Sequence, residues 1–126
     1  MRLTLVTLLV PSYEAGIRFF VSGLGWHLLS DEDQGHKRWV TVAPVSGGPA
    51  LLLARASDSA QTNAIGQQTG TRVGFFLQTD NFTRDAARIK AAGATFLESP
   101  RTEPYGSVAQ WRDPWGNLWD LIEPAP

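Results

Sequence analysis

The sequence predicts an α+β fold built from two βαβββ modules in tandem. Two amphipathic helices carry apolar stripes that repeat at a constant offset of 69 residues (82 − 13 and 93 − 24). The apolar segments that precede them, 5–10 and 74–79, repeat at the same offset. Three strand-like segments follow each helix. The matching stripes are Tyr13, Ile17, Phe20 and Leu24 in the first helix and Phe82, Ala86, Ile89 and Gly93 in the second.

Length and composition are those of one domain. A chain of 126 residues that is 43% hydrophobic can bury a substantial core. Eleven basic and twelve acidic residues give a net charge of −1, which argues against nucleic acid and anionic membranes as partners. The absence of cysteine excludes disulfides and thiolate zinc sites, and it fits a reducing compartment, so we expect a cytoplasmic protein.

The first module spans residues 1–55. Its opening apolar run reads as a buried strand over about 2–10, because it is too short to span a bilayer and no cleavage signal of a secreted protein follows. Ser12 is the expected cap of a helix over Tyr13–Ser22, which Gly23 and Gly25 end. Its remaining strands are predicted at Trp26–Ser30, Arg38–Ala43 and Ala50–Arg55.

Residues 56–72 are polar and contain glycine, so they are expected to connect the modules. The second module, residues 73–126, repeats the plan of the first within the same single domain, 1–126. Asp80 or Asn81 caps a helix over Phe82–Ala92, which ends at Gly93. Its later strands are predicted at Thr95–Ser99, Ser107–Arg112 and Leu118–Glu123.

Four short motifs occur in a characteristic order along this repeat: "GLG" at 23–25, "TDN" at 79–81, "YG" at 105–106 and "DPWGN" at 113–117. With these motifs the chain resembles the vicinal oxygen chelate superfamily, which includes glyoxalase I, bleomycin resistance proteins and extradiol dioxygenases. The resemblance implies cupped mixed sheets with helices on the convex face, a ligand or metal inside the cup, and a homodimer.

The resemblance also implies four metal-ligand positions, which His, Gln or Glu usually fill. They fall here at Leu5, Gly74, Asp120 and Ala50, or at Leu51 in place of Ala50 if the register slips by one. A transition metal needs about three protein ligands, so one carboxylate predicts no metal and no cofactor.

A second acidic cluster, Asp31-Glu32-Asp33, lies between His27 and His36. It reads as a solvated turn rather than a calcium loop, since Val42 stands where such a loop needs a glutamate.

Without a metal, the predicted cup is apolar with a few polar groups, as is typical of sites for organic ligands. Asp120 is the candidate catalytic base if burial raises its pKa, unless Arg112, Arg38, Thr7 or Thr41 pairs with it. Trp39 and Trp111 can stack on a planar ligand if they face inward, whereas Trp119 is expected in the core. Tyr105 either borders the pocket or packs in its turn. The predicted ligand-binding residues are Leu5, Thr7, Trp39, Thr41, Ala50, Leu52, Gly74, Phe76, Gln78, Tyr105, Trp111, Asp120 and Ile122.

Three functional hypotheses follow. The first is a metal-free protein that binds a partly apolar or aromatic small molecule and sequesters a drug or metabolite. The second is a lyase, isomerase or dioxygenase-like enzyme that uses Asp120 as base or holds a metal at a non-standard site. The third is an interaction module whose cup is filled by its own side chains. The first is favoured, with a homodimer as the expected assembly and with no role for nucleic acid or membrane.

Overall fold

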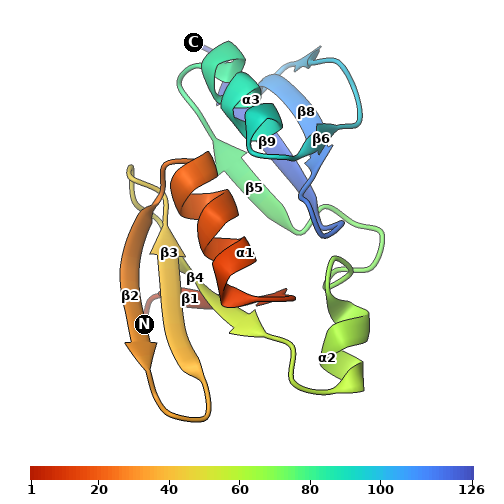
Figure 1. Cartoon of the computed structure of the whole chain (residues 1–126). Helices are drawn as coiled ribbons and strands as arrows, with labels where there is room; N and C mark the ends of the chain where they lie inside the picture. The colour runs from red at the N-terminus through yellow and green to blue at the C-terminus, as the bar shows by residue number, and fades with distance from the viewer. The chain divides into compact units, whose positions relative to one another are not determined.

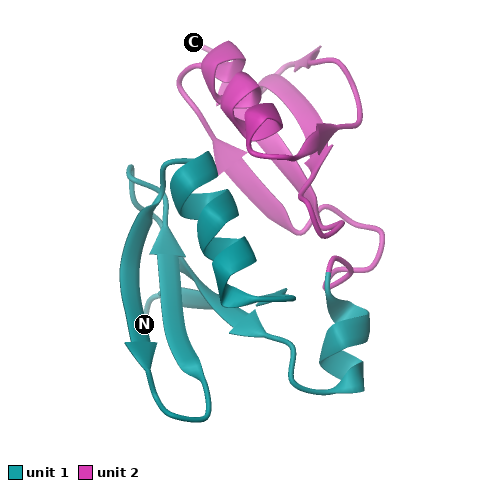
Figure 2. Ribbon diagram, in the orientation of Figure 1, with its two compact units in different colours: residues 1–65 teal, residues 66–126 magenta.

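The computed structural model describes residues 1–126 and confirms the α+β class, with two mixed sheets and few helices. The chain divides into two compact units, Met1–Ile65 and Gly66–Pro126 (Figure 2). Each unit holds one sheet and a helix packed on one of its faces. No helix is long and apolar enough to cross a membrane.

The first unit contains a four-stranded sheet in the order β1-β4-β3-β2 (Figure 1). Strands β1 and β4 are parallel, and the other neighbours are antiparallel. Helix α1 packs against β1, β3 and β4. The elements are β1 (Leu5–Val10), α1 (Tyr13–Ile17), η1 (Arg18–Gly23), β2 (His27–Asp33), β3 (Arg38–Ala43), β4 (Ala50–Arg55) and α2 (Ser59–Ala64).

The first helix begins as predicted, because the Ser12 hydroxyl oxygen accepts the Ala15 N–H at 3.1 Å. Beyond Ile17 it continues as a π-helical segment, η1, which periodicity did not predict. Gly16 lies where the helix meets β4, and a Cβ there would approach the Leu53 Cδ1 to 2.8 Å. A glycine is needed for this close packing of helix on sheet.

The second unit contains a five-stranded sheet in which β5, β9, β8 and β6 follow in that order and β7 also pairs with β8. Helix α3 packs against β9 and β6 (Figure 1). Strands β5 and β9 are parallel, as β1 and β4 are in the first unit. The elements are β5 (Phe75–Gln78), α3 (Phe82–Ala91), β6 (Thr95–Phe96), β7 (Arg101–Glu103), β8 (Gly106–Arg112) and β9 (Leu118–Pro124).

Three local features of the structure differ from the predicted elements or decide between two predictions. Asn81, not Asp80, caps α3, since its side-chain oxygen accepts the Arg84 N–H at 3.0 Å. The predicted strand over 95–99 ends at Phe96, because the Glu98 carboxylate accepts the Gln110 N–H at 2.8 Å in place of a backbone partner. Residues 56–72 contain the short helix α2, which Asp58 caps.

Each sheet has a helix face and a face that its own helix does not cover, called here the helix-free face. Residues alternate between the two faces along a strand, and residues paired across strands share a face. The helix faces form the two cores: Leu8, Val10, Val40, Val42 and Leu53 in the first unit, and Phe75, Trp111, Trp119 and Leu121, with Ala86 and Ile89 of α3, in the second.

Candidate ligand-binding site

The second helix-free face presents an exposed aromatic ring beside a carboxylate. Phe76 on β5 lies opposite Asp120 on β9, and Asp120 in turn lies opposite Gln110 on β8. The Phe76 side chain is 64% exposed, on the edge strand of the second sheet, which is a high exposure for a phenylalanine. Gln78 and Ile122 form the next pair along the same face. This arrangement offers a flat apolar surface with hydrogen-bonding groups at its side.

The Asp120 side chain is half-buried, and its carboxylate accepts no hydrogen bond from the second unit. Burial raises the pKa of its carboxyl group, the charge of Arg101 opposes that rise, and the charge of Glu98 adds to it. Two of the predicted partners of Asp120 are engaged within their own unit: Arg38 pairs with Glu14 and Asp31, and the Thr41 hydroxyl lies 2.5 Å from that of Ser30. The Asp120 oxygens are therefore available to a ligand that donates hydrogen bonds.

The raised pKa of Asp120 predicts how the Asp120→Asn variant responds to pH. The folded protein holds the Asp120 proton more tightly than the unfolded chain does, so ionisation of this group lowers stability as pH rises. The Asn variant lacks this titration. The thermal midpoint of the variant minus that of the wild type should increase as the pH rises from about 4, the ordinary aspartate range. The difference should become constant once the Asp120 carboxyl of the folded protein is ionised. Parallel scans against pH measure this, and a gain that shrinks with rising pH would contradict it.

Charged groups lie at the edge of this face. Arg101 on β7 pairs with Glu98 at 2.8 Å and with Glu103 at 3.1 Å, and Arg101 lies opposite Val108 of β8. Glu98 raises the pKa of the Arg101 guanidinium, which stays a cation. The pairing explains why Arg101 acts on Asp120 through its charge without bonding to it.

The first helix-free face is apolar with a few hydroxyls. Leu5 lies opposite Ala50, and Thr7 lies opposite Leu52, which pairs with Thr41 on its other side. Trp39 precedes Thr41 by two residues on β3 and therefore shares its face. Trp39, Thr7 and Leu52 therefore share the helix-free face of the first sheet, and their contact with a ligand stays a prediction.

Trp111 does not belong to the ligand-facing set. Its side chain is fully buried on the helix face, with its ring 5.0 Å from that of Trp119 and 6.4 Å from that of Phe96. The prediction of Trp111 as a pocket wall is wrong, because Trp111 and Trp119 are directly paired across β8 and β9 and so share a face. Tyr105 is 55% exposed in the turn between β7 and β8 and lies in neither sheet.

Three polar residues near these faces were not predicted. Gln110 and Arg101 lie on the second helix-free face, and Ser30 lies on the first. Strand alternation identifies Gln110 once its neighbour Trp111 is assigned to the helix face. No signal in the sequence identified Arg101, since the break between β6 and β7 was not foreseen.

No three His, Asp or Glu side chains come together in a group that could hold a metal ion. The prediction of a turn at Asp31-Glu32-Asp33 is wrong, because these residues form the end of β2 and pair with β3. Asp31 pairs with Arg38, and the Asp33 carboxylate accepts the Gly35 N–H at 2.8 Å.

Comparison with known proteins identifies the family of this chain. The family model described as Glyoxalase/Bleomycin resistance protein/Dioxygenase superfamily matches residues 2–121. The chain belongs to this superfamily. A protein of Shewanella frigidimarina (strain NCIMB 400), itself uncharacterized, is 45% identical over 121 residues, which are 94% of this chain and 90% of that protein.

Solved structures of the superfamily are similar over nearly the full chain. TnmS3, an antibiotic binding protein from Streptomyces sp. CB03234, is 29% identical, with a TM-score of 0.78 over 99% of this chain and 97% of its own. UcmS2 is 26% identical, with a TM-score of 0.81 over 97% of both chains. A glyoxalase/bleomycin resistance protein from Streptomyces sp. CB03234 is 29% identical, with a TM-score of 0.72 over 95% of this chain and 98% of its own.

In this superfamily member the predicted metal positions do not fit a metal. Leu5 and Ala50 are paired on one face and carry no donor atom, and Leu51 lies on the opposite face. At Gly74 a Cβ would lie 2.6 Å from the Thr69 Cγ2, so Thr69 occupies the space that a ligand side chain would need. Asp120 remains as a single carboxylate, short of the roughly three ligands that a metal needs.

The contact between Gly74 and Thr69 predicts that Gly74→Ala lowers the free energy of unfolding by about 1–3 kcal/mol, because the added methyl overpacks the site. Adding Thr69→Ala to that variant should recover much of the loss, since it removes the clashing Cγ2. A double-mutant cycle by urea unfolding measures the coupling between the two positions. Additive effects would show that Thr69 does not fill the position.

Proposed function

We propose that this protein binds a small, partly apolar or aromatic molecule without a metal, and that it sequesters a drug or metabolite. The observation that carries the proposal is on the second helix-free face, where the exposed Phe76 ring lies opposite the Asp120 carboxylate, which accepts no hydrogen bond from the second unit. An aromatic ring contributes stacking area and a carboxylate fixes orientation, which together are the features of an organic-ligand site.

Two further observations support the metal-free part and the ligand class. Thr69 fills the space next to Gly74, and Leu5 and Ala50 offer no donor atom, so three of the four family positions are closed to a metal. The similar protein TnmS3 is described as an antibiotic binding protein. We extend that description to this chain as an expectation about ligand size and aromatic character.

Thermal-shift screening tests the proposal. The purified protein is tested against aromatic metabolites, aromatic antibiotics and cationic glycopeptide antibiotics. A ligand that binds only the folded state raises the free energy of unfolding by mass action, by about 2.7 kcal/mol at a hundredfold excess over Kd. The thermal midpoint rises with it. Elemental analysis of the same preparation is expected to find no stoichiometric transition metal, and a bound metal would overturn the metal-free part.

Matched variants separate binding from stability in that screen. Phe76→Ala is expected to abolish the ligand-induced shift with little change in the midpoint of the free protein, because the ring is exposed. Val45→Ala is the control, since Val45 is 66% exposed and lies in the turn between β3 and β4. An equal loss of the shift in both variants would contradict a site at Phe76.

An enzyme is the second candidate, and the state of Asp120 favours it. A carboxylate with a raised pKa and no hydrogen-bond partner in its own unit can act as a general base in a lyase or isomerase reaction. Under this alternative, Asp120→Asn abolishes turnover of a bound compound and leaves its binding intact. If compounds found in the screen are recovered unchanged, sequestration stands.

We further propose a cytoplasmic homodimer. Its support is indirect: the chain has no cysteine, and the family resemblance implies pairing of modules. Sedimentation of the purified protein measures the assembly, and a monomer at micromolar concentration would contradict it.

A further inference from the structure

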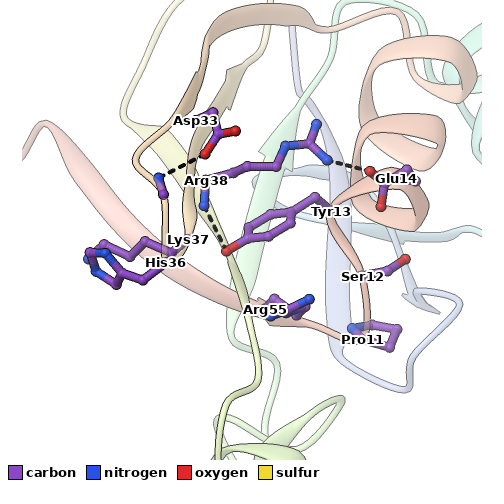
Figure 3. Close-up of a pocket in the computed structure, with 10 residues that line it drawn as sticks. Pro11, Ser12, Tyr13, Glu14, Asp33, His36, Lys37, Arg38 and Arg55 are labelled. Atoms are coloured by element: carbon purple, nitrogen blue, oxygen red, sulfur yellow. Dashed lines mark hydrogen bonds and ion pairs between the residues drawn. The ribbon is translucent and has the colours of Figure 1, made fainter.

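A pocket lies in the first unit on the helix side of its sheet, away from the helix-free face of that sheet. It has a volume of about 390 Å³. Three segments line it: the residues that lead into α1, the turn between β2 and β3, and the end of β4 (Figure 3). The residues that the argument uses are Tyr13, Glu14, Lys37, Arg38 and Arg55.

Positive charge in this pocket is only partly compensated. Arg38 is held by two carboxylates, those of Glu14 and Asp31. Lys37 and Arg55, by contrast, form no ion pair with any carboxylate of the protein. The Arg55 guanidinium lies 5.8 Å from the centre of the Tyr13 ring, a cation–π contact that holds it at the pocket wall. Two cations therefore line the pocket without an ion-pair partner, while the carboxylates of Glu14 and Asp33 in the same lining bind Arg38 and the Gly35 N–H.

Tyr13 adds a neutral donor. The residue is 8% exposed, and its hydroxyl oxygen accepts the Arg38 N–H at 3.3 Å. The hydroxyl hydrogen has no acceptor in the protein. Figure 3 shows the hydroxyl directed toward the chain at Lys37 and Arg38, with Arg55 beside the ring. A ligand oxygen in the pocket can accept that hydrogen.

The internal repeat gives an independent reason to expect an anion here. In the first unit Val10 pairs with Arg55, and α1 begins three residues later at Tyr13. In the second unit Thr79 lies beside Glu123, one step beyond the pair of Gln78 with Ile122, and α3 begins three residues later. Arg55 thus stands at the position of Glu123.

The chemistry at these two equivalent positions is opposite. The Glu123 carboxylate accepts the backbone N–H of Phe82 at 2.7 Å, so the second unit supplies its own anion. The first unit puts a guanidinium there and adds Lys37 on the facing turn. The first unit is therefore built to receive negative charge at a place where the second unit carries it.

We propose that the pocket of the first unit binds the anionic oxygen group of a small molecule, a phosphate or a carboxylate, through Arg55, Lys37 and the Tyr13 hydroxyl. Guanidinium and ammonium groups form charge-assisted hydrogen bonds with such oxygens. The pocket shares no residue with the site proposed above, so the inference does not depend on that function.

An NMR titration of the full chain with inorganic phosphate or acetate, at constant ionic strength, tests this site. We expect saturable amide shifts in residues 12–14, 35–38 and 55. Arg55→Glu should weaken the binding by on the order of tenfold or more, the effect of losing one charge-assisted hydrogen bond. Tighter binding of phosphate than of acetate assigns the site to phosphate, and the reverse order assigns it to carboxylates.

Two controls keep the test decisive. Arg18→Glu makes the same charge change at an exposed residue outside the pocket, and it should leave the affinity nearly unchanged. Arg55→Glu should fold, because it restores the carboxylate that the second unit has at this position. If it does not fold, Lys37→Ala serves instead, with an expected loss of affinity of several fold. Shifts that do not saturate with either anion, or equal losses in Arg18→Glu and the pocket variants, would overturn the proposal.

Discussion

Replacing Asp113 with alanine is expected to lower the free energy of unfolding by about 3–5 kcal/mol, a large part of the roughly 5–15 kcal/mol that stabilises a domain. Asp113 is 3% exposed and accepts five hydrogen bonds. Three come from backbone N–H groups of residues 115–117 at 2.9–3.0 Å, one from the Asn117 side chain at 2.9 Å and one from the Trp119 indole at 3.0 Å. Alanine removes all five of these hydrogen bonds. Urea unfolding followed by tryptophan fluorescence measures the loss.

Two further variants give this prediction its control and its gradation. Arg112→Ala changes the exposed neighbour and should alter stability by no more than about 0.5 kcal/mol. Asp113→Asn keeps one oxygen but can place an NH₂ group against the donors of Asn117 and Trp119, so its loss should be intermediate. A loss of less than about 1 kcal/mol in Asp113→Ala would show that water replaces the carboxylate.

The fold could be predicted because its signals are local and repeated. The 69-residue repeat and the capping residue Ser12 rest on short-range chemistry that tertiary packing did not override. Exceptions arose where a side chain replaced a backbone partner. Glu98 bonds to the Gln110 N–H and ends β6 early, and a bond of this kind between residues twelve positions apart leaves no periodic signal.

The pairing of two expected metal positions could be predicted because strand register follows from the repeat. Leu5 lies opposite Ala50, as the unslipped register requires. What the sequence could not show is Thr69, whose methyl group fills the space beside Gly74. Thr69 lies in the polar connector, and composition gives no information on which strand such a segment covers. The reason that Gly74 is closed to a ligand side chain is therefore a packing contact that only the structure reveals.

The assignment of tryptophans to faces failed at one residue for a reason that the sequence contains. Trp111 and Trp119 flank the turn at Asp113–Asn117, whose hydrogen bond from the Asp113 N–H to the Asn117 oxygen closes the hairpin at 2.9 Å. Residues equally distant from such a closure are paired and share a face. Assigning Trp119 to the core therefore requires Trp111 in the core as well, and it leaves Gln110 and Asp120 together on the other face.

Trp111→Ala is expected to lower the free energy of unfolding by about 3–5 kcal/mol, because it empties a fully buried site between Trp119 and Phe96. Phe76→Ala should cost little stability, since that ring is 64% exposed. Urea unfolding measures both changes. The larger loss of stability identifies the aromatic residue of the core, and the smaller loss identifies the exposed residue that a ligand can reach.

Ligand binding should show the reverse order, and Trp111→Phe makes the comparison possible because it keeps an aromatic ring in the core and should fold. Its affinity for any compound found in the screen should equal that of the wild type, whereas Phe76→Ala should lose binding. A Trp111→Phe variant that is stable but no longer binds the compound would show that Trp111 contributes to binding. It would then act through the position of β8, because its ring lies on the face opposite Phe76 and Asp120.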